Sequence, residues 1–533
     1  MTDGLNFIAG DWVSGSHAIV SRNPSDLSDV IGRFAQASSE EVYQAVEAAS
    51  LAQRKWAATG LEARSAALDA IGRELMARAN ELGTLLSREE GKPLVEGCGE
   101  VYRAGQFFTY YAAEVLRQIG ENADSVRAGV EIDIRREPVG VVAVISPWNF
   151  PTATAAWKIA PALAFGNAVV WKPANLVPAS AVALTEIIAR QSALPPGLFA
   201  LVMGQGASVG QTLIEHPGID AITFTGSTAV GRRIAGTGAA RLARVQCEMG
   251  SKNALAIMDD ADLDIAVACA VGGAFGGTGQ KCTASSRLVV HGAVHDEFVE
   301  RLVAQTKAMR VGNALDPETQ MGPVVSEAQL RQNLDYMALA REEGGEVLCG
   351  GTKLDLSSEG YFMAPAVIGC TSNQWRVNRE EMFAPIACII RVESYEEALA
   401  TVNDTSYGLT SGIVTRDLAR ASDFRRNAGR ERDDGAFPHR RASIRELVRA
   451  HLPPDARRRR RCDPCHHRLS RDLSRDRRQF RALEPVVRRL SRPHPTRQDR
   501  RRRQAGESHE PDRDLLRFPE PVSDRGRYRP GGD

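Results

Sequence analysis

A single cysteine, Cys282, lies in a stretch of glycines and small hydroxyl residues that reads GGAFGGTGQKCTASSR. A thiolate is a far better nucleophile toward a carbonyl carbon than a hydroxyl group, and the glycines leave open backbone on both sides. The nearest histidines, His291 and His295, come only after the next apolar run. Because most single cysteines are small core residues, a structural role is the alternative. The segment therefore predicts either attack on a carbonyl compound or a plain core position for this thiol.

A second group of polar residues follows the apolar run VVAVI. The segment ISPWNFP holds Trp148 and Asn149 between Pro147 and Pro151. The Asn149 carboxamide can donate a hydrogen bond to an oxyanion that develops during a reaction. It can also brace the turn between the two prolines. Both interpretations are open on these residues alone.

A third segment, FTGSTAVGRRIA, places Gly226, Ser227 and Gly231 where an apolar run meets a helical pattern. Backbone N–H groups at the start of a helix can hold a phosphate, and the Ser227 hydroxyl adds a further donor. The spacing matches neither GxGxxG nor a P-loop. Phosphate binding and a plain tight turn are therefore equally open.

These residues must be positioned by alternating helices and strands. A capping box from Ser38 to Glu41 opens one helical pattern, and a second over residues 64–91 ends at Gly91. Apolar, β-rich runs then alternate with helical segments: VGVVAVIS, NAVVWK, FALVMG, AITFTGS and ALAIMD. Strands that are apolar on both faces predict a buried parallel sheet in a doubly wound α/β domain. Ligands bind such sheets beyond the carboxyl ends of the strands, where Asn149 falls.

Length and composition indicate a globular protein of two or three domains. The chain has 533 residues, of which 43% are hydrophobic and 25% are charged. The start, MTDGLNFIAGDW, lacks the pattern of a secretory signal, and no apolar run is long enough to cross a bilayer. The nine cysteines show no framework spacing, which predicts reduced thiols. We therefore expect a cytoplasmic protein that binds no membrane.

Six motifs occur in an order that is typical of one family. They are PWNFP, WKPAN, FTGSTAVG, CEMGSKN, GQKCTASSR and REEMFAPI. On these motifs the chain resembles the NAD(P)-dependent aldehyde dehydrogenase superfamily from about Asn6 to Ala428. NFIAGDWVSG and LSREEGKPL are most similar to the α-ketoglutaric semialdehyde (2,5-dioxopentanoate) dehydrogenase branch. The resemblance implies an aldehyde dehydrogenase-like α/β fold and oxidation of a small semialdehyde to its acid.

The resemblance also implies roles for four catalytic residues. The cysteine matching Cys282 attacks the aldehyde and gives a thiohemiacetal, which passes a hydride to the nicotinamide and becomes a thioester. Asn149 and the backbone N–H of Cys282 form the oxyanion hole. Glu248 is the general base that activates water. Lys158 matches a lysine that assists proton movement, and its alternative is a charge on a helix surface.

The expected cofactor is NADP or NAD, and no metal is expected. Lys172 matches the lysine that reaches the adenosine ribose, and Glu381 and Phe383 match the pair that holds the nicotinamide ribose and ring. Trp148 and Ser227 match positions along the pyrophosphate path. NAD-preferring members often carry a glutamate three residues after the lysine, where this chain has Asn175. The missing carboxylate favours NADP.

Two positions depart from the family pattern. The usual double glycine after the general base reads Gly250-Ser251, and the usual glycine of the nicotinamide motif is Ala384. Each departure adds only a small side chain. We expect modest perturbation unless a position needs a positive φ.

The resemblance implies a division into four parts. A dinucleotide-binding domain spans residues 1–121 and 141–250, and 122–140 form an oligomerisation hairpin predicted by the alternation in SVRAGVEIDIRREPVG. The catalytic domain spans 251–429 and is incomplete at its C-terminal end. Residues 430–533 form the tail.

The tail lacks the segment that closes the family's catalytic domain. It contains 30 Arg, no Lys and 17 Asp plus Glu, a balance of +13 that leaves −12 for the rest of the chain. Such a composition predicts disorder. The run Arg457–Arg461 could bind nucleic acid and CDPCHH could bind a metal, but a shifted reading frame is the leading explanation. The homo-oligomer expected for the family is therefore in doubt, and an inactive, poorly assembled remnant is the alternative to an enzyme.

Overall fold

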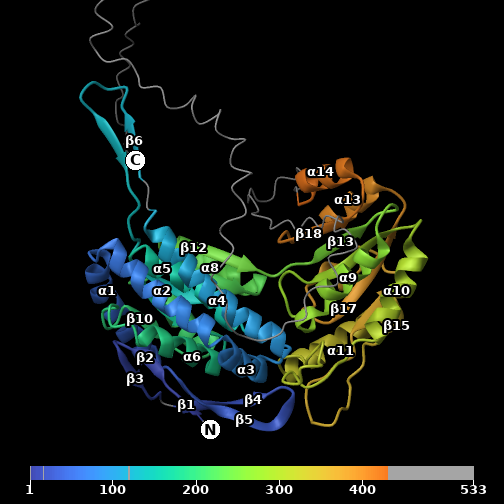
Figure 1. The fold of residues 1–533 in the computed structure, drawn as a ribbon, viewed down its shortest axis with the longest axis horizontal. Coiled ribbons are helices and arrows are strands. Elements are labelled where there is room, and N and C mark those ends of the chain that lie inside the picture. Colours follow the sequence, from blue (N-terminus) through green and yellow to red (C-terminus); the bar gives the residue numbers. More distant parts are fainter. Residues whose placement is uncertain (1, 16, 118–119, 430–533) are drawn as a thin grey trace, which may run out of the picture. The chain divides into compact units, whose positions relative to one another are not determined.

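The computed structural model describes residues 2–15, 17–117 and 120–429 (Figure 1), all within one compact unit, Met1–His451. Everything predicted for the tail, 430–533, lies outside the described residues. No described helix is long and apolar enough to cross a membrane.

A seven-stranded sheet forms the first layer of the fold. Its five strands from β12 to β10 run parallel, and the two N-terminal strands extend it in antiparallel fashion. In spatial order the strands are β12 (Arg244–Met249), β11 (Ala221–Gly226), β8 (Val141–Ile145), β9 (Ala168–Lys172), β10 (Phe199–Leu201), β2 (Asn6–Ile8) and β3 (Asp11–Val13). The strand order reverses between β8 and β11, as in a doubly wound fold. The predicted fold class is confirmed, and β8 and β9 are buried because helices cover both faces of the sheet.

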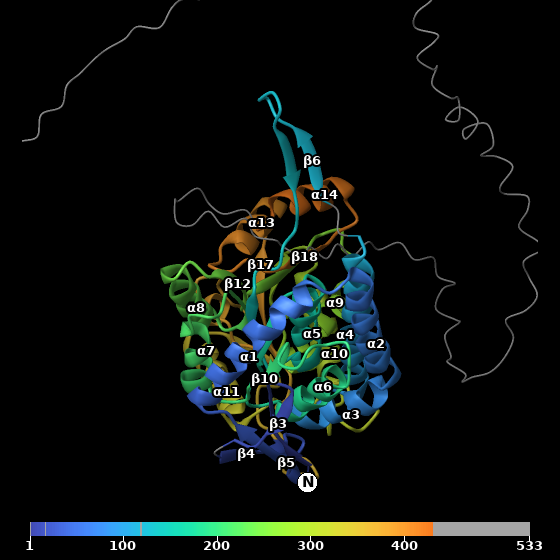
Figure 2. The same cartoon turned by 90° about the vertical axis from the view of Figure 1, so that its left-hand side faces the viewer.

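The helices of this part precede or connect the parallel strands. They are α1 (Ser39–Ala57), α2 (Leu61–Ala77), α3 (Ala79–Glu90), α4 (Leu94–Val115), α5 (Pro151–Ala164), α6 (Pro178–Ala189), the π-helix η1 (Gly206–Gly210), α7 (Gln211–Glu215) and α8 (Thr228–Ala240). Helix α4 packs against α2, α3 and α5, as Figures 1 and 2 show.

Two helix predictions have different outcomes. The capping box is confirmed, because the Ser38 hydroxyl accepts from the N–H of Glu41 and the Glu41 carboxylate accepts from the N–H of Ser38. The single helix predicted over 64–91 is wrong. The chain leaves helical geometry at Arg78, where φ is −99° and ψ is 16°, so α2 and α3 are separate. Gly91 ends α3, as predicted, and its backbone lies in the left-handed region.

A six-stranded sheet forms the second part of the described fold. Its strands in spatial order are β15 (Glu346–Cys349), β16 (Ala366–Gly369), β17 (Ile386–Val392), β14 (Ser285–His291), β13 (Asn253–Ile257) and β18 (Ser411–Val414). All neighbours are parallel except β15 and β16. The helices are α9 (Leu263–Phe275), η2 (Gly276–Gly279), α10 (His295–Lys307), α11 (Glu327–Glu342), α12 (Arg376–Arg379), α13 (Tyr395–Asn403) and α14 (Leu418–Asn427). The predicted division at residue 250 falls between β12 and β13, and the four-part domain division stays a prediction.

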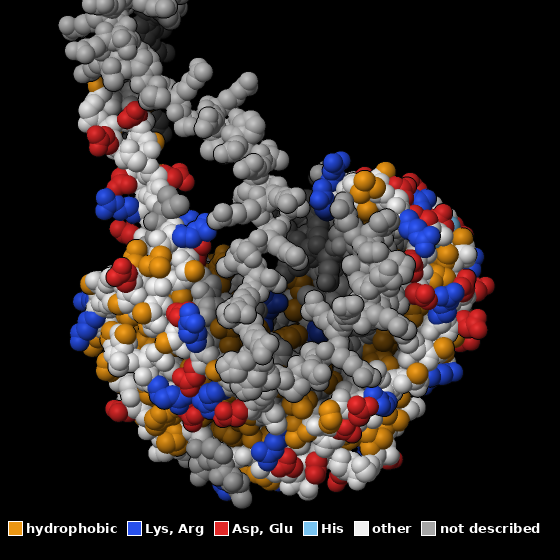
Figure 3. All heavy atoms as spheres, viewed as in Figure 1, with side chains coloured by type: hydrophobic (Ala, Val, Ile, Leu, Met, Phe, Trp, Pro, Cys, Tyr) orange, Lys and Arg blue, Asp and Glu red, His pale blue; other side chains and the backbone are white. Residues whose placement is uncertain are grey.

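Two smaller sheets complete the described fold. One has the order β1 (Thr2–Gly4), β5 (Asp26–Gln36) and β4 (His17–Asn23). The other is the predicted hairpin, with β6 (Glu121–Asp124) paired to β7 (Glu131–Ile134). Its first strand therefore begins before the alternating segment, which supplies the turn and the second strand. The hairpin stands away from the helices in Figures 1 and 2, and Figure 3 shows acidic and basic side chains along it.

Candidate functional site

The predicted site residues lie at opposite strand ends in the two sheets. In the seven-stranded sheet they follow the carboxyl ends of β8, β9 and β11 or lie near the end of β12, and β8 and β11 mark the reversal of strand order. In the six-stranded sheet they precede the amino ends of β14 and β17. The expectation that carboxyl ends carry the site therefore holds for the first sheet only.

Cys282 lies in a turn between η2 and β14 and is half-buried. The Asn253 carboxamide fixes this turn by donating to the carbonyls of Cys282, at 2.7 Å, and Ala284, at 3.1 Å. Upstream, Thr278 has a φ of 57°, an uncommon conformation for a residue with a side chain. The thiol is therefore presented by a loop whose backbone is tightly specified.

Asn149 reaches this loop from the other sheet. Its side chain is 6% exposed, and Nδ2 donates to the carbonyl of Gln280 at 2.9 Å. The carboxamide therefore contacts the Cys282 loop, 131 residues away in sequence, instead of bracing its own turn. This contact brings a predicted oxyanion donor and the predicted nucleophile into one site.

Two carboxylates influence the charge state of the thiol. Burial raises the pKa of Cys282 above its ordinary value, and the charges of Glu381 and Glu248 raise it further. The shift keeps the thiol protonated to a higher pH than a free cysteine. Both carboxylates that the sequence assigned to this site therefore act on Cys282 electrostatically.

Glu248 belongs to a chain of polar side chains that ends at Lys158. Gln246 donates from Nε2 to Glu248 at 2.8 Å, and its Oε1 accepts from Lys158 Nζ at 3.3 Å. Lys158 also donates to the Thr223 hydroxyl at 2.9 Å. Burial lowers the pKa of Lys158 to about 8, although the nearby Glu248 opposes the shift. Lys158 is 5% exposed, so the alternative of a charge on a helix surface is wrong.

The proposed adenosine end has unpaired polar atoms. Lys172, at the end of β9, is 6% exposed and donates to the carbonyl of Pro173 at 2.8 Å, and burial lowers its pKa to about 8. Asn175 Oδ1 and the hydroxyls of Thr225 and Thr228 are buried without a hydrogen-bond partner among the described residues. Buried polar atoms are normally paired. A ribose and phosphates, rich in donors and acceptors, fit these residues.

The proposed nicotinamide end joins three segments. Glu381 accepts from the N–H of Ser251 at 2.9 Å, and a Cβ on Gly250 would displace the Glu381 carboxylate from this place. The rings of Trp148 and Phe383 meet edge to face with centroids 5.4 Å apart. The two aromatic residues assigned to the cofactor therefore come together, although their segments are far apart in sequence.

The two departures from the family pattern need no left-handed backbone. Neither Ser251 nor Ala384 has a positive φ, whereas Phe383 does, at 55°. Ser251 is buried, and its hydroxyl is paired with Asn253. Both small side chains are therefore accommodated without backbone strain.

The glycines around α8 have a packing role. A Cβ on Gly231 would lie 2.6 Å from Met249 Sδ, and one on Gly226 would lie 2.6 Å from the Phe224 ring. Ser227 is the N-cap residue of α8, and its side chain makes no capping hydrogen bond. A glycine at each position is explained by close packing alone, and phosphate binding at this turn stays a prediction.

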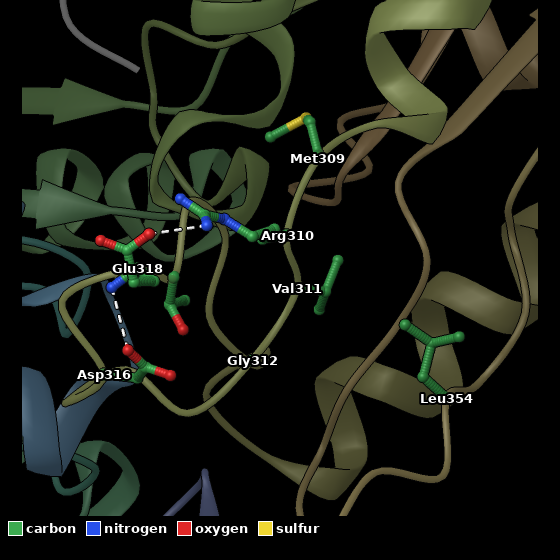
Figure 4. A pocket seen from close by; sticks show the side chains of 8 residues that line it. Met309, Arg310, Val311, Gly312, Asp316, Glu318 and Leu354 are labelled. Atoms are coloured by element: carbon green, nitrogen blue, oxygen red, sulfur yellow. Dashed lines mark hydrogen bonds and ion pairs between the residues drawn. The ribbon is translucent and has the colours of Figure 1, made fainter.

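A pocket of about 450 Å³ lies elsewhere, along residues 309–319 (Figure 4). Arg310 points toward Glu318 across this pocket, and their ion pair measures 2.6 Å. None of the predicted site residues lines it. Among the described residues no cluster of histidine, cysteine and acidic side chains could hold a metal ion.

Sequence reasoning missed two residues of the site. Gln246 and Asn253 lie on either side of Glu248 in RVQCEMGSKN, and their side chains hold Glu248 and the Cys282 turn. Their position next to a motif was a signal, but the partner of each amide depends on tertiary contacts.

The site combines a thiol in a turn with a carboxamide donor and two carboxylates, and the residues at a nearby strand end fit a nucleotide. This combination is typical of enzymes that oxidise aldehydes through a cysteine adduct. The chain belongs to the aldehyde dehydrogenase family, which it matches over residues 12–429. It is 40% identical over 427 residues to the α-ketoglutaric semialdehyde dehydrogenase of Bacillus subtilis (strain 168), covering 79% of this chain and 87% of that protein. The protein is therefore an aldehyde dehydrogenase family enzyme, and NAD(P)-dependent aldehyde oxidation is the activity typical of this family.

Two solved structures share the fold. The betaine aldehyde dehydrogenase of Staphylococcus aureus in complex with NAD+ matches with a TM-score of 0.78 and 31% identity, covering 80% of this chain and 85% of that one. The 3,6-anhydro-L-galactose dehydrogenase in complex with NADP matches with a TM-score of 0.79 and 30% identity, covering 85% and 93%. One of these structural relatives therefore binds NAD+, and the other binds NADP.

Proposed function

We propose that this enzyme oxidises a small semialdehyde such as 2,5-dioxopentanoate to the carboxylic acid, with Cys282 as nucleophile. The observation that carries the proposal is the contact between Asn149 and Gln280, which joins an amide donor to the thiol loop. The substrate class is supported by the name of the Bacillus subtilis relative and by the sequence motifs.

In the proposed reaction the Cys282 thiolate bonds to the aldehyde carbon, and the carbonyl electron pair moves to oxygen. Asn149 Nδ2 and the N–H of Cys282 stabilise this oxyanion. The thiohemiacetal carbon then loses a hydride, for which a bound nicotinamide would be the acceptor, and a thioester on Cys282 remains. Glu248 then takes a proton from water, whose oxygen attacks the thioester and releases the acid and the thiolate.

The proton that Glu248 takes up needs a route away from the site. Gln246 links Glu248 to Lys158, whose pKa of about 8 allows it to lose or gain a proton near neutral pH. Because an amide passes a proton poorly, Gln246 orients the Glu248 carboxylate, and Lys158 stabilises its charge. Lys158 would therefore act on Glu248 through its charge and not as a relay for the proton.

For the cofactor we propose NADP in preference to NAD. Lys172 and Asn175 would hold the adenosine ribose, Gly226, Ser227, Gly231 and Trp148 the pyrophosphate path, and Glu381 and Phe383 the nicotinamide end. Asn175 presents a buried, unpaired Oδ1 and no negative charge to this region. A neutral residue imposes no like-charge repulsion on a 2′-phosphate.

We further propose that copies of this chain associate through the hairpin β6–β7. Its apolar side chains Val126, Val130, Ile132 and Ile134 are exposed. A two-stranded hairpin is marginally stable alone, so a partner surface is expected to cover it. The cytoplasmic location inferred from the sequence also stays a prediction.

The decisive experiment assays purified protein against a panel of aldehydes, including 2,5-dioxopentanoate, with NADP and with NAD. We expect Cys282→Ala to abolish turnover and Glu248→Gln to let the thioester accumulate, which mass spectrometry detects as a mass increase on Cys282. Cys370→Ala removes an exposed thiol and is the matched control. Turnover by Cys282→Ala at the wild-type rate would refute the nucleophile assignment.

A further inference from the structure

A buried ionic cluster beside Asn149 connects the end of α3 with the first turns of α4. Lys92 and Glu100 are 3% and 5% exposed, and Lys92 Nζ lies 2.7 Å from Glu100 Oε2. Glu90, 1% exposed, lies 3.9 Å from the same Nζ. Buried charges are costly unless they are paired and hydrogen-bonded. None of these three residues has a role in the proposed chemistry.

Each member of the Lys92–Glu100 pair also contacts the backbone around Asn149. Lys92 Nζ donates to the Asn149 carbonyl at 2.5 Å and lies 4.1 Å from the centre of the Phe150 ring. Glu100 Oε1 accepts from the N–H groups of Thr152 and Ala153, at 2.9 and 3.1 Å, in the first turn of α5. The pair therefore binds the chain on both sides of Asn149.

A second carboxylate on the same helix face holds the thiol loop. Glu96 is one turn before Glu100, and its Oε1 accepts from the N–H of Gly277 in η2 at 3.1 Å. The first turns of α4 therefore contact both segments that Asn149 and Gln280 join. Hydrogen bonds with Lys92 and Glu100 therefore hold the backbone on both sides of Asn149, and the hydrogen bond with Glu96 holds the loop that the Asn149 side chain contacts.

We propose that Lys92 and Glu100 are positioning residues that hold the Asn149 carboxamide at the correct distance from the Cys282 turn. This inference rests on the proposed role of Asn149 as an oxyanion donor. The charges agree with it: burial raises the pKa of Glu90 to about 8, so Glu90 is mainly protonated at neutral pH. Burial lowers the pKa of Lys92, but the charge of Glu100 and its hydrogen bond to the amine oppose this effect, and the pKa is raised overall. Lys92 therefore stays charged and paired with Glu100.

The test compares four variants of the full chain: Lys92→Met, Glu100→Gln, Asn149→Ala and the double variant Lys92→Met/Asn149→Ala. Two rates are measured: NADP reduction with an aldehyde, and acylation of Cys282 by p-nitrophenyl acetate without cofactor. In the second assay the thiolate bonds to the ester carbon, an oxyanion forms, and nitrophenolate leaves. Arg88→Met is the control, because it removes a partly buried ion pair with Asp29 that does not contact Asn149.

We expect Lys92→Met and Glu100→Gln to lower kcat and the acylation rate about 10- to 100-fold, with little change in KM, because small displacements of reacting groups cost rates of this order. The double variant should be no slower than Asn149→Ala alone, because both changes remove the same interaction. Arg88→Met should lower Tm without slowing acylation. Should Lys92→Met not fold, Glu100→Gln combined with Asn149→Ala gives the same comparison.

The inference is overturned if the effects of Lys92→Met and Asn149→Ala multiply in the double variant. It is also overturned if Lys92→Met and Glu100→Gln are both acylated at the wild-type rate. A wild-type protein that is acylated by the ester but reduces neither NADP nor NAD counts against the proposed function only, because the acylation rates still decide the role of the pair. A wild-type Cys282 that the ester does not acylate overturns both.

Discussion

The Cys282 thiol lies near two carboxylates, so its ionisation is the property that single substitutions should change most directly. We predict that Glu381→Gln moves the pH midpoint of Cys282 alkylation by iodoacetamide to lower pH. The reason is that burial raises the pKa of Cys282 and the Glu381 charge raises it further, so a neutral amide favours the thiolate. Mass spectrometry of the Cys282 peptide measures the rate at each pH. Glu380→Gln is the control, since Glu380 is paired with Arg376, and an equal shift in both variants would contradict the prediction.

A single residue also tests the cofactor preference. We predict that Asn175→Glu lowers the ratio of kcat/KM with NADP to kcat/KM with NAD by about 10- to 100-fold, because a carboxylate beside a 2′-phosphate costs up to several kcal/mol. Steady-state kinetics with both cofactors measures the ratio. Asn175→Gln introduces a side chain of the same size as glutamate but without the charge, and it should change the ratio little. A ratio that Asn175→Glu leaves unchanged would show that other residues set the preference.

Lys252 provides a prediction about stability. Its amine is 1% exposed and has no hydrogen-bond partner among the described residues, and burial lowers its pKa from 10.5 to about 8. Between these values the unfolded chain binds the proton and the folded chain does not, so the free energy of unfolding rises with pH. Below about pH 8 the shift costs the folded state roughly 3 kcal/mol.

Lys252→Met should therefore raise Tm at pH 7, and the difference from wild type should shrink as the pH approaches 10.5. Calorimetry across this range measures both effects. Lys353→Met, at a largely exposed position, is the control and should show neither. A lower Tm for Lys252→Met at pH 7 would mean that the amine has a stabilising partner.

Single-residue predictions from the sequence were strongest where a motif is contiguous. Cys282, Asn149 and Glu248 each stand in a recognisable segment, and the structure brings Asn149 to the thiol loop and Glu248 within electrostatic range of the thiol. Lys92 lies in the motif LSREEGKPL, which assigns it no role, and Glu100 lies outside all of the motifs. Their importance comes from contacts with the Asn149 region, up to 57 residues away, which no local pattern encodes.

At the scale of elements, α4 is located by close helix packing. A Cβ on Gly105 would lie 2.6 Å from the Gly72 carbonyl and 2.6 Å from Met76 Cγ, so α2 and α4 touch through their backbones. We predict that Gly105→Ala lowers the free energy of unfolding by about 1–3 kcal/mol, the usual cost of overpacking. Gly99→Ala is the matched control, since nothing lies within 4 Å of its Cβ and alanine favours helices. Denaturant unfolding measures both, and equal stability of the two variants would contradict the prediction.

The strands β8 to β11 and β13 were predictable because their runs are mainly apolar, and each of the five predicted runs overlaps one of these strands. The break between α2 and α3 was not, because Arg78 has a good helix propensity and helical spacing continues through it. The short N-terminal strands β1 to β3 were also missed. They are three residues long, too short to show a period.

For the whole molecule, the site depends on both sheets. Loops that follow the carboxyl ends of strands in the first sheet contact loops that precede the amino ends of strands in the second. The sequence patterns predict one parallel sheet for all five runs, whereas β13, the strand of ALAIMD, belongs to the second sheet. The contact of the loop after β8 with the loop before β14 is a tertiary contact that no local pattern encodes. The family match ends at residue 429, and so do the described residues. We keep the hypothesis that the reading frame changes near Gly429. Sequencing the gene tests it: another frame downstream should encode an apolar, glycine-containing segment that ends in a β-rich strand, and its absence would leave a genuine basic extension.

Association through the hairpin is the remaining prediction for the whole molecule. Ile132 and Ile134 point to the same face of β7 because they are two residues apart, and they are 43% and 53% exposed. Lysines at both positions should weaken association, since charged side chains on an exposed strand oppose pairing with another chain. Glu131→Lys changes the net charge by the same amount on the opposite face and is the control. Sedimentation velocity should show smaller species for Ile132→Lys/Ile134→Lys than for wild type or Glu131→Lys, and a wild-type protein that sediments as a monomer at all concentrations would show that this hairpin has no partner.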